Sequence, residues 1–130
     1  MMSFETTLRL KRFEADEKAR KVQDLEYMIH DFEQMSSDLA RQIMAEEERT
    51  GIKDASHFSY STFAKSAAQR RDNLMASIEE LRDKLQVAQQ ELDEAKDSLE
   101  KAIAASEGRE DKRASRFAVA DNTITPIVHR

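Results

Sequence analysis

The sequence predicts an all-α protein, a long antiparallel two-helix coiled-coil hairpin followed by a disordered C-terminal tail. Three observations support this prediction. Charged residues make up 36% of the chain, only two Gly and one Pro occur in 130 residues, and apolar residues recur in steps of three and four. So few turn-forming residues exclude a β-sandwich or barrel, which needs frequent turns. The sustained apolar period distinguishes the chain from a disordered one of similar charge.

The first helix is expected over residues 3–50, which contain neither Gly nor Pro. A mostly apolar stripe with this period faces a partner helix, so it predicts a coiled-coil seam. Gly51 follows as a residue suited to the left-handed position that ends a helix. The stripe consists of Phe4, Leu8, Lys11, Ala15, Lys18, Val22, Leu25, Ile29, Phe32, Ser36, Leu39, Ile43 and Glu46.

A turn is expected over residues 51–60 and a second helix over residues 61–113, with Ser59 or Ser61 as its N-terminal cap. Residues 1–113 would then form the hairpin, and residues 114–130, which are low in charge, would form a flexible tail. The second stripe consists of Tyr60, Ala64, Ala67, Arg71, Leu74, Ile78, Leu81, Leu85, Ala88, Leu92, Ala95, Leu99, Ala102 and Ser106.

One register aligns the two stripes when the chain folds back near residue 55. Small residues then often face larger ones, as interdigitating side chains require. The layers include Ile43 with Ala67, Ile29 with Leu81, and Leu25 with Leu85. Charges of opposite sign also meet beside the seam, Lys21 with Glu91 and Glu26 with Arg82.

No catalytic, cofactor-binding or metal-binding constellation is recognisable, so we do not expect an enzyme. The chain has no Cys, its three histidines are far apart in sequence, and it has no Gly-rich phosphate loop. The acidic run at residues 46–48 is interpreted as a solvated helix end. The net charge of −5 disfavours nucleic-acid binding, and no apolar run is long enough for direct membrane insertion.

Candidate partner-binding residues fall into three groups. The basic side chains of Arg9, Lys11, Arg12 and Arg20 could dock onto an acidic protein surface, or could form an ordinary solvated face. The flexible thioethers of Met35 and Met75 could recognise a partner, or could merely widen the seam. The aromatic rings of Phe58 and Tyr60 could form an exposed knob, or could pack with Phe63 to close the hairpin.

Several segments resemble the FliJ family, small cytoplasmic proteins of flagellar export, and the alphaproteobacterial version above all. They are residues 8–13 (LRLKRF) with 17–18 (EK), 45–52 (AEEERTGI), 55–60 (ASHFSY) and 69–74 (QRRDNL). The resemblance covers about residues 4–100, and the region around the turn is its most specific part. The tail after residue 113 departs from the family pattern.

This resemblance implies an antiparallel coiled coil similar to the central stalk of rotary ATPases. Such a protein inserts into the ring of the export ATPase FliI, contacts the export gate protein FlhA and handles export chaperones. It would lie in the cytoplasm at the inner membrane, at the flagellar base. The resemblance implies that the end with the chain termini faces the ring. The basic side chains named above would then contact the ring. The methionines and turn aromatics would face the gate.

Two other functions remain open at this point. Two hairpins could pair through the methionine flank into a purely structural four-helix bundle. Alternatively, the chain could be a coiled-coil interaction module of another secretion or cell-division complex.

Overall fold

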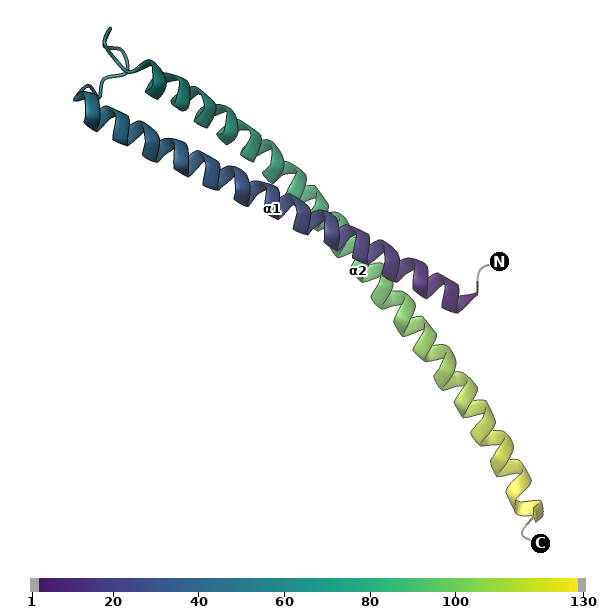
Figure 1. The fold of residues 1–130 in the computed structure, drawn as a ribbon. Helices are drawn as coiled ribbons and strands as arrows, with labels where there is room; N and C mark the ends of the chain where they lie inside the picture. Colours follow the sequence, from purple (N-terminus) through teal and green to yellow (C-terminus); the bar gives the residue numbers. More distant parts are fainter. Residues whose placement is uncertain (1–2, 129–130) are drawn as a thin grey trace. The chain divides into compact units, whose positions relative to one another are not determined.

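Two long helices packed against each other as a hairpin make up the fold (Figure 1). The computed structural model describes residues 3–128, and the side chains of residues 3–115. Helix α1 spans Phe4–Thr50, and helix α2 spans Thr62–Val128. The all-α hairpin predicted from the sequence is therefore confirmed. The chain reverses between Thr50 and Thr62, where the turn was expected.

The chain divides into two compact units, each built from a segment of both helices. The turn unit comprises Ala19–Gln90, and the terminal unit comprises Met1–Lys18 with Glu91–Arg130. In the turn unit the two segments run in opposite directions from the connecting loop (Figure 1). In the terminal unit the Phe4 ring of α1 lies 4.6 Å from the guanidinium carbon of Arg109 in α2.

The predicted seam is confirmed in both helices, because every one of its positions is buried or half-buried. Side chains three and four residues apart lie on one face of a helix, so a stripe with this period can be covered by one neighbour. The buried apolar side chains of the turn unit are Val22, Leu25, Ile29, Leu39, Ile43, Ala64, Ala67, Ile78, Leu81 and Ala88.

A compact apolar cluster lies next to the loop. Leu39 and Ile43 of α1 pack with Ala64 and Ala67 of α2, and Tyr60 packs against them from the loop. Ile43 and Ala67, which the sequence placed in one layer, therefore belong to the same cluster. Alanine on α2 leaves room for the branched side chains of α1, so the two backbones can approach closely here.

The charged pairs beside the seam differ from those predicted. Arg82 lies 3.7 Å from Glu33, so the predicted pairing with Glu26 is wrong. Glu91 accepts a 2.8 Å hydrogen bond from Lys18, three residues before the predicted Lys21. Long basic side chains reach diagonally across a seam, so the register of the backbone does not decide which carboxylate they meet. The Glu91 hydrogen bond and charge raise the pKa of Lys18.

Both helix ends at the loop have the expected caps. Gly51 has a φ of 73° and donates its N–H to the Glu47 carbonyl at 2.9 Å, which ends α1 in the left-handed conformation. The Ala64 N–H donates to the Ser61 hydroxyl at 3.1 Å, so Ser61 rather than Ser59 caps α2.

The far end of α2 lies further along the chain than predicted. The sequence placed the end of the second helix at residue 113, whereas α2 continues to Val128. Residues 114–120 (ASRFAVA) contain three Ala and no Gly, so their intrinsic propensity does not stop a helix. The flexible tail predicted for residues 114–130 falls mostly on residues whose side chains lie outside those described, and it stays a prediction.

Candidate functional site

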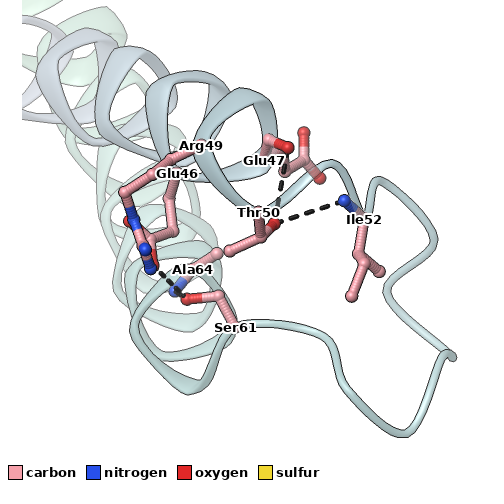
Figure 2. A network of polar contacts seen from close by, with 7 residues as sticks. All are labelled: Glu46, Glu47, Arg49, Thr50, Ile52, Ser61 and Ala64. Carbon is pink, nitrogen blue, oxygen red and sulfur yellow. Dashed lines mark hydrogen bonds and ion pairs between the residues drawn. The ribbon is translucent and has the colours of Figure 1, made fainter.

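The loop end of the hairpin is held by side-chain bonds between the last turn of α1 and the residues that begin α2 (Figure 2). Ser61 donates its hydroxyl to Glu46 Oε1 at 2.9 Å, and Arg49 donates to the same oxygen at 2.6 Å. Tyr60 donates its hydroxyl to Glu47 Oε2 at 2.8 Å. We call the bonds Glu46–Ser61 and Glu47–Tyr60 the turn clasp.

Hydrogen bonds at the loop end shift the pKa of two side chains of the turn clasp, Glu46 and Tyr60. The bonds from Arg49 and Ser61 lower the pKa of Glu46 to about 2, because both favour the carboxylate. The bond to Glu47 raises the pKa of Tyr60, because the proton that the phenol would lose is shared with a carboxylate. The interpretation of residues 46–48 as a solvated helix end is therefore wrong for Glu46 and Glu47. Glu46 lies on the predicted seam, and this position was the sign in the sequence that its side chain would not be fully solvated.

The acid stability of the hairpin should depend on Glu46. A pKa lowered from 4.5 to about 2 means that the ionised carboxylate stabilises the fold above pH 4.5. That contribution is lost as the pH falls through about 2. We expect Glu46→Gln to lower the melting temperature at neutral pH and to flatten its decline between pH 4.5 and 2, measured by circular dichroism.

Glu48→Gln is the matched control, because Glu48 is exposed and lies in the same helical turn. It removes the same charge without touching the turn clasp. A Glu46→Gln protein with the melting temperatures and the acid profile of Glu48→Gln would contradict the stabilising role of the Glu46 carboxylate.

The loop has a defined backbone conformation. Asp54 Oδ1 accepts hydrogen bonds from the Ser56 N–H at 2.9 Å and from the Ser56 hydroxyl at 2.7 Å. The His57 N–H donates to the Asp54 carbonyl at 3.1 Å, and the Tyr60 N–H donates to the His57 carbonyl at 3.0 Å. Successive turns of this kind restrict the loop, although no helix or strand contains it.

The aromatic candidates have different environments. Phe58 is 94% exposed, and its ring stacks on that of His57 with a centroid distance of 4.7 Å. Tyr60 is half-buried, packs on the apolar cluster and belongs to the turn clasp. Phe63 is 55% exposed. Of the two aromatic candidates, Tyr60 therefore closes the hairpin while Phe58 is presented to solvent.

The two methionine candidates line separate open grooves of the turn unit. Met35 lies in a groove of about 530 Å³ whose apolar lining includes Phe32 and Leu74. Met75 lies in another groove, beside Ile78 and Arg82. Both methionines are about half exposed, at 52% and 53%. Met75 directly follows the seam residue Leu74 and therefore flanks one side of the α2 stripe. Asn73 directly precedes Leu74 and flanks the other side, and it lines the groove that contains Met35.

The basic candidates also differ in environment. Arg9 and Arg12 are exposed on α1 in the terminal unit, and three residues apart they share one side of the helix. Arg9 lies 3.5 Å from Glu5. Lys11 is half-buried in the seam, 4.0 Å from Glu14. Arg20 is exposed in the turn unit.

Among the residues that the structure describes, no group of three or more His, Asp or Glu side chains could hold a metal ion. Over the same part of the chain, neither helix has an apolar stretch long enough to cross a bilayer. Comparisons with protein-family models, curated proteins and solved structures found no match to this chain.

Proposed function

We propose that this chain is a non-enzymatic stalk and adaptor of the flagellar type III export apparatus. It binds the ring of the export ATPase FliI and the export gate protein FlhA, assists the handling of export chaperones, and works in the cytoplasm at the flagellar base. The observation that carries the proposal is a long two-helix hairpin whose turn segment, residues 45–60, resembles that of the FliJ family.

The residues of the resembling turn segment have structural roles, which supports the proposal. Gly51 ends α1, Glu46 and Glu47 form the turn clasp, and Tyr60 joins the clasp to the apolar cluster. A heptad pattern alone would match any coiled coil, but these residues build one particular chain reversal. The pattern of these residues is therefore stronger support for the resemblance to the FliJ family than the seam is.

The basic group would contact the ATPase ring. Arg9 and Arg12 are exposed, and the Arg9–Glu5 pair lies on the surface. Exposed ion pairs contribute little, so Arg9 can exchange Glu5 for an acidic partner at small cost. Lys11, half-buried beside Glu14, would add its charge to the basic side chains of the terminal unit. Arg20, which is exposed in the turn unit, would be a separate contact with the ring.

The gate would contact side chains of the turn unit. Met35 and Met75 offer adaptable thioethers in two grooves, and Phe58 is exposed at the loop. Open grooves along a helix pair suit a helical or extended segment of a partner, which is also how an export chaperone could be held. Tyr60 would act on this surface indirectly, by fixing the loop.

Co-purification with FliI and FlhA tests the proposal. We expect the wild-type chain to bind both, and we expect Arg9→Glu with Arg12→Glu to weaken FliI binding about tenfold or more. Binding of FlhA should be unchanged. Deletion of the coding sequence should abolish swimming and filament export, which a component of another secretion or cell-division complex would not do.

The control reverses two exposed lysines of the turn unit, Lys65→Glu with Lys84→Glu, and so makes the same change in net charge. If it weakened FliI binding as much as the arginine reversal, the basic group would have no specific role. A wild-type chain that bound neither FliI nor FlhA would overturn the proposed function.

A structural role through self-association is the second candidate. Met28 is 44% exposed and Met35 is 52% exposed, seven residues apart on one side of α1, so a second hairpin could cover them. Solution mass distinguishes the two functions. A monomer supports the stalk, and a dimer that dissociates on Met28→Lys with Met35→Lys supports the structural role.

A further inference from the structure

The loop presents one side chain almost wholly to solvent. Phe58 is 94% exposed, more than any other large apolar side chain that the structure describes, while the neighbouring Tyr60 is half-buried. A single exposed aromatic ring is common on protein surfaces and indicates nothing by itself. Phe58 differs from an ordinary exposed ring because hydrogen bonds hold the backbone beside it and the His57 ring stacks on it.

The backbone on both sides of Phe58 is held by hydrogen bonds. The His57 N–H donates to the Asp54 carbonyl before the ring, and the Tyr60 N–H donates to the His57 carbonyl after it. The Glu47–Tyr60 bond of the turn clasp then ties the loop to α1. A side chain on a restrained backbone loses less conformational entropy when a partner immobilises it.

The ring of Phe58 is supported on one face. It stacks on the His57 ring at 4.7 Å with an angle of 22° between the planes. The Ser59 N–H donates to His57 Nδ1 at 3.0 Å, which orients the imidazole. Together the two rings form a stacked aromatic pair that is exposed to solvent, a shape that can insert into a pocket with little rearrangement.

The charges around the loop favour a protein partner over a lipid surface. Between the two helices, residues 51–61 carry one basic side chain, Lys53, and one carboxylate, Asp54, so the loop has no excess of positive charge. The bonds from Ser56 lower the pKa of Asp54, so it stays ionised at neutral pH. Anionic membranes attract clusters of basic residues, and this loop has none.

We infer that the stacked rings of His57 and Phe58 form a preformed knob that inserts Phe58 into an apolar pocket of a protein partner. In this arrangement Tyr60 does not contact the partner, because its hydroxyl and ring serve the turn clasp and the apolar cluster. The inference rests on the proposed function, in which the partner at the turn is the export gate.

The test measures the affinity of the full chain for the soluble domain of FlhA. We expect Phe58→Ala to weaken binding about tenfold or more, since a buried aromatic anchor dominates an interface. Its melting temperature should not change, because the ring is exposed. Tyr60→Phe removes the bond to Glu47 and keeps the ring, so it should lower the melting temperature. Because this variant loosens the loop but leaves Phe58 in place, it should weaken the affinity less than Phe58→Ala does.

Phe13→Ala is the matched control, because Phe13 is also an exposed aromatic, at 61%, but lies in the terminal unit. It should bind the gate as the wild type does. Equal affinity of wild type and Phe58→Ala, with FliI binding intact, would overturn the knob and leave the proposed function standing. Wild-type chain that bound neither protein would overturn both. Phe58-dependent binding to anionic phosphatidylserine vesicles, without binding to FlhA, would also overturn the knob.

Discussion

Ile43→Ala is expected to lower the free energy of unfolding by about 2–5 kcal/mol, measured by chemical denaturation. Ile43 is 7% exposed and packs with Leu39, Ala64 and Ala67 in the cluster next to the loop. The substitution removes buried carbon atoms and leaves a cavity that two rigid helices cannot easily fill. A hairpin of two helices has a small core, so this loss is a large part of its total stability.

Met44→Ala is the matched control for this substitution. Met44 is the next residue of α1 and has a side chain of similar size, but it is 63% exposed. Removal of an exposed side chain usually changes stability by about 0.5 kcal/mol or less. If Met44→Ala destabilised the protein as much as Ile43→Ala, the cluster next to the loop would not be the core of the turn unit.

Ala64→Leu is expected to destabilise the hairpin by about 1–3 kcal/mol, because it overfills a packed layer. Ala64 has no exposed surface, and it lies in the first turn of α2 against Leu39 and Ile43. The added carbons would force the helices apart next to the turn clasp. The measurement is the melting temperature and the free energy of unfolding of the full chain.

Ala76→Leu provides the comparison, because Ala76 is an exposed residue of the same helix. Ala and Leu have similar helix propensities, so any difference between the two variants reports packing rather than helix formation. Wild-type stability in Ala64→Leu would show that the space around residue 64 is not filled.

The seam could be predicted from the sequence because it depends on helix geometry alone. Residues in steps of three and four share one face, whatever their chemistry, so even Lys11 and Arg71 lie where the stripe placed them. The end of α1 could be predicted from Gly51, because few other residues adopt a left-handed backbone conformation at low cost.

The side-chain bonds could not be predicted in the same way. Arg82 and Lys18 have long flexible stems, and which carboxylate each meets depends on rotamers that no period encodes. The Glu47–Tyr60 bond joins residues across the reversal, so it requires the conformation of the loop. That conformation separates Phe58 from Tyr60, which the sequence had placed in one group.

The end of α2 was missed for a different reason. Helix propensity is nearly flat across residues 107–120, apart from Gly108, so no residue there marks a boundary. A capping signal comparable with Ser61 at the beginning of α2 is lacking at residue 113. Local chemistry therefore determined one end of this helix clearly and the other hardly at all.

Along the described part of the seam, one device by which many coiled coils fix their alignment is missing. Within residues 3–115, no polar or charged side chain is fully buried, whereas coiled coils often use one buried polar residue to select a single alignment. The covalent reversal and the turn clasp therefore contribute to the alignment, together with the packed layers and the Lys18–Glu91 bond. A chain cut at the loop would lose that contribution, so its two halves would align less strictly and could more easily pair with other chains.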